Sequence, residues 1–294
     1  MTSHITILAR RSIVLFLRDK TAVFFSFLSS LIIVALYVLF IGKTYSAGLM
    51  EESSFFAGNA GSYLVYLQMI AGVMAVNSLS LSIGAFSTIA KDFETRRVDS
   101  FLITPIKVSR LIAAYFFGGF IASFVLNCVT WIAAFALIGG LTAYWVTAVV
   151  FVKVIAILVF ASFMSSSIML LITSLLKSTS AISVFMGVSG TFIGFLCGVY
   201  MPFSMLGKTV EKIGSVIPFT HVSVWFKRVI LSGAFEQIKM PSPLNDMVLD
   251  SFSASNVGFV SLDIPLWGML LYCAAFALIC LFAAWNILRR RIGK

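Results

Sequence analysis

Long apolar runs, separated by short polar segments, occupy most of this chain. A helix needs about 20 apolar residues to cross the roughly 30 Å of hydrocarbon in a bilayer. Six runs reach that length: residues 22–42, 63–90, 111–139, 147–176, 179–201 and 266–288. The pattern therefore predicts an all-α integral membrane protein with six transmembrane helices.

The segment before the first run interleaves apolar and basic positions. Its apolar side chains recur every three or four residues, beginning with Ile5 and Leu8. Its cations, which would meet lipid headgroups, are Arg10, Arg11 and Arg18. We predict that residues 1–21 form an amphipathic helix on the membrane surface. The alternative is a basic tail that only sets the topology.

Residues 202–265 form the longest segment between two spans. Five of the six prolines of the chain lie there. Within the segment, residues 222–230 have helical spacing but are too short to span a bilayer, which predicts a re-entrant or interfacial helix. Residues 241–256 are polar enough for a solvent-exposed loop. Residues 22–294 are thus predicted to form one six-span domain.

The composition excludes several classes of protein. Apolar residues make up 60% of the chain and charged residues 11%, whereas soluble domains are about 25% charged. A secreted enzyme, a disordered chain and a nucleic-acid-binding domain are excluded, despite the net charge of +10. The four cysteines are scattered through apolar stretches without metal-ligand spacing, so no metal site is predicted: Cys128, Cys197, Cys273 and Cys280.

Most Lys and Arg residues fall on one side of the six spans. They are Arg10, Arg11, Arg18, Lys20, Lys91, Arg96, Arg97, Lys107, Arg110, Lys177, Arg289, Arg290, Arg291 and Lys294. Cytoplasmic loops carry such an excess. Both termini are therefore predicted to lie in the cytoplasm, in a multi-pass protein of the cell membrane.

Residues 91–110 form the most highly charged inner loop. Glu94 and Arg97 are three residues apart, a spacing that lets them meet on a helix, and Pro105 then interrupts any helix. An apolar corner at residues 101–103 precedes the proline. An exposed apolar corner flanked by charges suits docking onto another protein. The alternative is an ordinary inner loop whose charges set the topology.

The spans contain neutral polar side chains but almost no charge. The only charged residue is Lys153, near a span end, which argues against a proton-driven carrier and a selective ion channel. The candidate pathway-lining residues are Gln68, Asn77 and Asn127; the alternative role is hydrogen bonding between helices. In the fifth span, small residues repeat every four positions, which predicts close packing with a second subunit: Gly190, Gly194 and Gly198.

No nucleotide-binding loop of the form G-x-x-x-x-G-K-[ST] occurs. The fragments Gly42-Lys43-Thr44 and Gly207-Lys208-Thr209 lack its first glycine and would lie at the outer face, away from cytosolic ATP. The chain is also predicted to hold no cofactor and no catalytic residues of its own. The best cluster for an enzyme is Asp92, Glu94, Arg96 and Arg97, with no nucleophile beside it. A membrane-embedded lipid-modifying enzyme is therefore kept only as an alternative.

The arrangement resembles the type-2 ABC transporter permeases, in particular the bacterial half-permeases that work with a separate ATPase. A surface helix, six spans and a long last outer loop occur in that order. The segment from Glu94 to Pro105 is similar to the family's E-x-x-x-G-T-L-E-x-L-x-x-T-P, with Val98 and Asp99 in place of Gly-Thr. Gly198 to Pro202, with a later P-x-T, is similar to the family's outer stretch.

The resemblance implies partners that the residues alone do not name. Two cytosolic ATPase subunits, which bind ATP and Mg²⁺, would dock on the surface helix and on residues 91–110. The residues expected to couple to them are Glu94, Arg97, Phe101, Thr104 and Pro105. A second permease, either an identical copy or a similar chain, would pair with this one around a central pathway.

The substrate is predicted from the lining of the spans, which is apolar with scattered hydroxyl groups. Such a lining suits export of a hydrophobic or amphipathic compound, such as a drug, antibiotic, toxin or lipid. Because aromatic side chains also stack on sugars, export of a polysaccharide or lipid-linked glycan is the alternative. The predicted outer gate comprises Tyr200, Met201 and Pro202, at the end of the fifth span.

Overall fold

The computed structural model describes residues 3–56, 59–103, 106–142, 144–176, 178–200, 208–254 and 265–292. Within these residues the regular structure is helical. The elements are α1 (Ser3–Arg18), α2 (Lys20–Leu36), the π-helix η1 (Tyr37–Ile41), α3 (Gly42–Glu52), the 3-10 helix η2 (Ser54–Phe56), α4 (Asn59–Glu94), α5 (Arg97–Leu102), α6 (Val108–Thr142), α7 (Ala148–Leu175), α8 (Thr179–Leu196), α10 (Lys208–Val216), α11 (Pro218–Gln237), α12 (Ser242–Ser251) and α13 (Leu266–Ile292).

Six helical segments among the described residues are long and apolar enough to cross a bilayer, which confirms the predicted all-α, six-span class. Two of them end differently from the prediction. The first continues through η1 as far as Leu49. The fifth, α8, ends at Leu196 instead of residue 201, because Gly198 adopts a φ of 61°. Such a left-handed residue commonly ends a helix.

Helix α4 is the centre of the bundle. The most apolar 18-residue stretch of α4 is completely buried. Helices α2, α6, α7, α8 and α11 pack around it. Glycines allow this close approach. A Cβ added at Gly84 would lie 2.0 Å from Ser26 Oγ, and one added at Gly119 would lie 2.2 Å from Phe86 Cε2. The other five spans each keep an apolar face on the outside of the bundle, as lipid-facing helices do.

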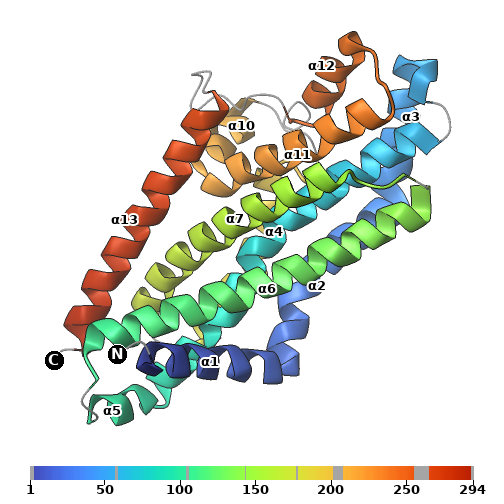
Figure 1. Cartoon of the computed structure of the whole chain (residues 1–294). Helices are drawn as coiled ribbons and strands as arrows, with labels where there is room; N and C mark the ends of the chain where they lie inside the picture. The colour runs from blue at the N-terminus through green and yellow to red at the C-terminus, as the bar shows by residue number, and fades with distance from the viewer. Residues whose placement is uncertain are drawn as a thin grey trace.

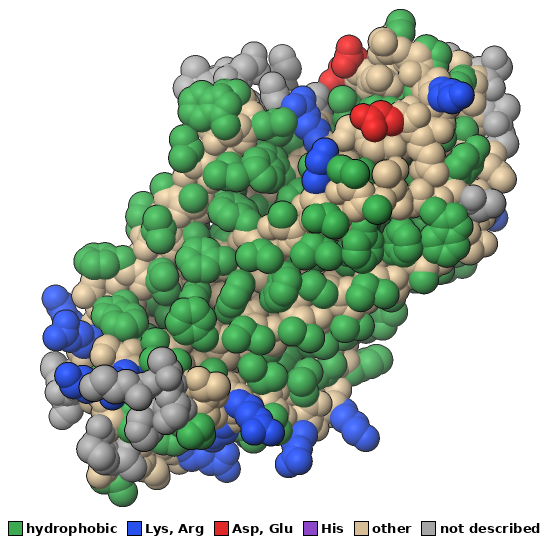
Figure 2. Space-filling view, viewed as in Figure 1, with side chains coloured by type: hydrophobic (Ala, Val, Ile, Leu, Met, Phe, Trp, Pro, Cys, Tyr) green, Lys and Arg blue, Asp and Glu red, His purple; other side chains and the backbone are tan. Residues whose placement is uncertain are grey.

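The two ends of the bundle differ in charge. Helices α1 and α5 lie at the end where the chain starts and finishes, and α3 and α12 lie at the opposite end (Figure 1). Figure 2 shows many Lys and Arg side chains at the first end, an apolar belt in the middle, and the Asp and Glu side chains of this face at the other end. We call these the basic end and the far end. The first described helix, α1, and the end of the last, α13, both lie at the basic end.

The segment before the last span is more helical than predicted. The expected short helix at 222–230 is the middle of α11, which begins with Pro218 in its first turn, where a missing N–H costs nothing. Residues 241–256, predicted to be a solvent-exposed loop, contain α12. This helix forms because Val248 and Phe252 lie buried on one side of it, which the polar composition concealed.

Candidate coupling site and gate

At the basic end, an ion pair joins three helices. Arg11 on α1 donates two hydrogen bonds to Asp92 on α4, with Nη1–Oδ2 at 2.7 Å and Nη2–Oδ1 at 3.0 Å. Tyr115 on α6 donates a third to the same carboxylate, at 3.0 Å. Asp92 is buried, and the hydrogen bond to it raises the pKa of Arg11. Two parallel bonds of this kind restrict orientation as well as distance.

This geometry changes the predicted role of the surface helix. Arg10 and Arg18 are exposed, in keeping with contact to lipid headgroups, but Arg11 faces Asp92 in the bundle. Its partner is 81 residues away in the sequence, and no local pattern indicated the pairing. Asp92, one of the two acids of the alternative enzyme cluster, accepts hydrogen bonds from Arg11 and Tyr115.

Helix α5 is attached to the same ion pair. The Arg11 guanidinium carbon lies 5.2 Å from the centre of the Phe101 ring, a cation–π distance. The side chain of Val98, in the first turn of α5, is buried, whereas Ile103, which follows the helix, is 88% exposed. Within the predicted apolar corner, the Phe101 ring therefore packs against Arg11, whereas Ile103 is exposed. We refer to Arg11, Asp92, Tyr115 and Phe101 as the Arg11 cluster. Thr104 and Pro105 lie outside the described residues.

Glu94 makes a different contact from the predicted one. Helix α4 ends at Glu94, and Arg96 turns the chain with a left-handed φ of 54°, so Glu94 and Arg97 do not share a helix. Glu94 Oε2 instead accepts from Thr179 N at 3.0 Å and Thr179 Oγ1 at 2.6 Å. A carboxylate at this position satisfies a free N–H at the start of α8 and complements the helix dipole. Arg97 is exposed.

The last span also joins this end. Arg291, in the final turn of α13, donates from Nη1 to the Ser174 carbonyl at 3.2 Å. Its guanidinium carbon lies 4.6 Å from the Phe93 ring. The contacts at the basic end thus connect α1 and α5 with α4, α6, α7, α8 and α13.

The predicted pathway-lining residues lie inside the chain. Gln68, Asn77 and Asn127 are each no more than 1% exposed. Asn77 Oδ1 accepts from Ser30 Oγ at 2.8 Å, and Asn77 Nδ2 donates to Thr130 Oγ1 at 2.9 Å. Asn127 Nδ2 donates to Ser162 Oγ at 3.2 Å, and Gln68 Nε2 to the Phe252 carbonyl at 3.3 Å. These are contacts between elements of one bundle, the alternative role given above.

The glycines of α8 are likewise used within the chain. A Cβ at Gly194 would lie 2.1 Å from Tyr200 Cε2, because the Tyr200 ring folds back onto this glycine. The ring also contacts Phe195, with centroids 4.7 Å apart. Gly190 is buried as well. The predicted gate residue Tyr200 is thus 8% exposed, while Met201 and Pro202 lie outside the described residues.

A different face of α8 is exposed. Its side chains, at helical spacing, are Val184, Val188, Phe192 and Phe195, with exposed fractions of 67%, 52%, 62% and 43%. This face, not the glycine face, is available to lipid or to a second subunit.

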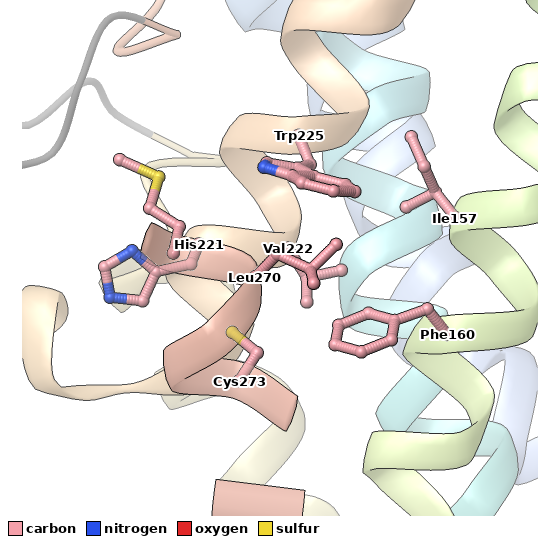
Figure 3. Close-up of a pocket in the computed structure, with 8 residues that line it drawn as sticks. Ile157, Phe160, His221, Val222, Trp225, Leu270 and Cys273 are labelled. Atoms are coloured by element: carbon pink, nitrogen blue, oxygen red, sulfur yellow. The ribbon is translucent and has the colours of Figure 1, made fainter. Parts of the chain in front are cut away.

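A small pocket lies between α7, α11 and α13 (Figure 3). Its lining is Ile157, Phe160, His221, Val222, Trp225, Met269, Leu270 and Cys273. The empty space among these side chains, including the part open to solvent, is about 210 Å³. Burial lowers the pKa of His221, whose Nε2 lies 2.7 Å from the Ser215 carbonyl.

Comparison with protein families identifies one match. Residues 56–286 match the family model described as "ABC-2 family transporter protein". The matched stretch is most of the chain, from η2 to the last turns of α13. A search of curated proteins found no match.

Proposed function

The chain belongs to the ABC-2 transporter family, and from that membership we propose that it is the membrane permease subunit of an ATP-driven exporter. In this assignment the protein lies in the cell membrane with its basic end on the cytoplasmic side, in keeping with the excess of Lys and Arg at that end. The protein is a transport subunit, and ATP hydrolysis takes place on a partner chain that holds ATP and Mg²⁺.

The observation that carries this proposal is the Arg11 cluster. A separate ATPase has to move the spans from outside the bilayer, so its docking surface needs rigid contacts with several of them. Exposed Ile103 supplies an apolar docking point beside the Phe101 ring, and that ring rests on Arg11. Arg11 in turn holds α4 and α6 through Asp92. Arg97, Thr104 and Pro105 complete the proposed docking segment.

Glu94 extends the coupling to the fifth span. Its carboxylate holds the first turn of α8 through Thr179, so a movement of residues 94–103 also moves α8. Helix α8 carries Tyr200 at its other end. We propose that Tyr200, together with Met201 and Pro202, closes the pathway on the outer side. Closure of two ATPase subunits would thus act on this gate through a single helix.

A second permease, identical or similar, is proposed to complete the pathway. The exposed face of α8 from Val184 to Phe195 is the surface we assign to that contact. Gln68, Asn77 and Asn127 would meet the pathway only if the helices around α4 separate during transport. The apolar outer faces of the spans favour a hydrophobic or amphipathic substrate that enters from the inner leaflet. A lipid-linked glycan is the competing substrate.

The function is tested by reconstituting the permease with its ATPase in lipid vesicles. We expect amphipathic compounds to stimulate ATP hydrolysis and to leave the vesicle lumen or leaflet in an ATP-dependent manner. Stimulation by an undecaprenyl-linked glycan alone would overturn the amphiphile assignment. Failure of any cytosolic ATPase to co-purify with the permease would overturn the assignment as an ABC subunit.

The docking segment is tested by Phe101→Ala. Removing the ring detaches α5 from Arg11, so we expect ATPase binding to weaken, or hydrolysis to continue without transport. Membrane insertion should be unaffected. Phe282→Ala is the matched control, because Phe282 is a 71% exposed ring on α13 that faces lipid. Normal coupled transport by Phe101→Ala would contradict the assignment.

A further inference from the structure

The far end of α8 is held by side chains that donate to four consecutive carbonyl groups. The last carbonyls of a helix have no partner within the helix. Here the donors are Thr220 Oγ1 to Leu196 O at 3.0 Å, Ser223 Oγ to Cys197 O at 3.3 Å, Lys227 Nζ to Gly198 O at 2.9 Å and Tyr37 OH to Val199 O at 2.6 Å. Residues 220, 223 and 227 lie on one face of α11, since helical side chains align every three or four residues.

Lys227 differs from the other three donors because it also binds a second helix end. Its Nζ donates to the Phe252 carbonyl at 2.9 Å, and Phe252 is the residue that follows α12. The side chain is 0% exposed. Among the described residues the ion pair found is Arg11–Asp92, so no carboxylate there neutralises the lysine. We call Lys227 Nζ and the carbonyl oxygens of Gly198 and Phe252 the Lys227 clasp.

We propose that Lys227 is a proton-responsive positioning residue for the outer gate: as a neutral amine it holds the end of α8 against the turn after α12, and proton uptake releases that end. The assignment of this segment as a gate rests on the proposed transport function, whereas the Lys227 clasp is independent of that function. A neutral amine has two N–H donors, which matches the two carbonyl groups that Lys227 binds in the clasp. An ammonium has a third.

Among the residues that the structure describes, the groups around the clasp include no acid that would keep the lysine charged. Cys197 and Tyr200 lie on the end of α8, and Tyr37 and Tyr45 on the first span; Arg228, beside Lys227, donates Nε to the Ala254 carbonyl at 3.0 Å. The acids of α12, Asp246 and Asp250, are exposed. The negative ends of two helix dipoles favour a cation, but complete burial opposes it.

Burial outweighs the dipoles and lowers the pKa of Lys227 from its ordinary value of 10.5 to about 7. Lys227 lies on α11, outside the six spans. Once the clasp opens to water, the lysine regains its ordinary pKa, so the open form binds the proton more tightly. Proton uptake therefore favours opening as the pH falls from about 10.5 to about 7, and the effect levels off below that.

The released segment contains Tyr200, the described residue of the proposed gate. Val199 N and Tyr200 N both donate to the Gly194 carbonyl, at 3.0 Å and 3.3 Å. When Lys227 no longer holds Gly198, these two amides and the Tyr200 ring lose the support of the clasp. Thr220, Ser223 and Tyr37 alone then hold the neighbouring carbonyl groups. Amide hydrogen exchange at residues 197–200 thus reports directly on the clasp.

The test is hydrogen exchange of the permease alone in lipid nanodiscs, measured by mass spectrometry between pH 8.5 and pH 6.5. Intrinsic exchange also depends on pH, so the wild-type rate is divided at each pH by the rate of Lys227→Met, which cannot titrate. We expect this ratio to rise about tenfold or more as the pH falls. The sign of the change does not depend on whether the methionine itself tightens or loosens the segment.

Lys212→Met is the matched control, since it removes an exposed lysine from α10 and should keep the wild-type pH slope. If Lys227→Met does not fold, Lys227→Gln supplies a non-titrating reference that still donates N–H. A ratio that stays constant over this pH range overturns the proposal. Because no ATPase or substrate is present, this outcome is separate from any failure of the proposed transport function.

Discussion

The two ends of the bundle are each held by a basic side chain that bridges neighbouring helices, and the two side chains have different partners. At the basic end, Arg11 pairs with a carboxylate. At the far end, the hydrogen-bond partners of Lys227 are two backbone carbonyl oxygens. An arginine paired with a carboxylate stays charged at any physiological pH, whereas a buried lysine without an acid titrates. The comparison separates a permanent connection, suited to transmitting force, from one that protons can release.

Breaking the permanent connection should have the largest effect. Arg11→Ala leaves Asp92 buried without its cation, a change that costs about 3–5 kcal/mol in a fully buried pair. The Arg11 side chain is 29% exposed, so we expect about 2 kcal/mol of destabilisation by thermal or denaturant unfolding, together with loss of coupled transport. Arg10→Ala, one residue away and exposed, should change neither.

A double-mutant cycle sharpens this result. Replacing both Arg11 and Asp92 by apolar residues of similar size removes the uncompensated charge, so stability should recover while coupling stays impaired. Equal destabilisation by Arg10→Ala and Arg11→Ala would show that the ion pair does not hold this end.

The response to pH should distinguish the two ends next. Between pH 8.5 and pH 6.5, opening at residues 197–200 should increase about tenfold, because the pKa of Lys227 is lowered to about 7. The pKa of Arg11 is raised, so this cation does not titrate there, and exchange around Asp92, corrected for its intrinsic rate, should change less than about twofold. An equal response at both ends would remove the distinction.

The sequence predicted the spans because their signal is local and additive. Each of the six segments is identified by its own hydropathy, without knowledge of its neighbours. The contacts that hold the ends are not local. Arg11 and Asp92 are 81 residues apart, and Glu94 and Thr179 are 85 apart. A carbonyl acceptor has no sequence signature at all, so the partners of Lys227 were not predictable.

Other features of the sequence indicated that a helix face is packed, but they did not identify what packs against it. Thr220, Ser223 and Lys227 form a polar stripe at helical spacing, which indicates a shared partner for that face of α11. The glycines of α8 correctly indicated close packing, but sequence could not say what packs there. The answer is Tyr200 of the same chain, only six positions beyond Gly194, because Gly198 reverses the backbone between them.

This glycine contact gives a smaller test at the far end. Gly194→Ala places a Cβ 2.1 Å from Tyr200 Cε2, so the ring has to move, at a cost of about 1 kcal/mol by unfolding measurements. The control is Gly187→Ala on the same helix, where an added Cβ has nothing within 4 Å. The permease dimer should persist in both variants. A dimer lost only in Gly194→Ala would restore the glycine face as the subunit contact.

The smallest effect is expected from Glu94, because its contact with Thr179 is exposed at the protein surface. Glu94→Gln keeps the size of the side chain but removes the negative charge from the start of α8. A charged cap acts only on the first turn of a helix, so exchange at the first amides of α8 should rise by about twofold to threefold, with no change at residues 197–200. Glu236→Gln, an exposed acid at the end of α11, is the control and should leave α8 unchanged. If Glu94→Gln instead loosened the far end as much as the near one, the carboxylate would stabilise α8 as a whole and not only its first turn.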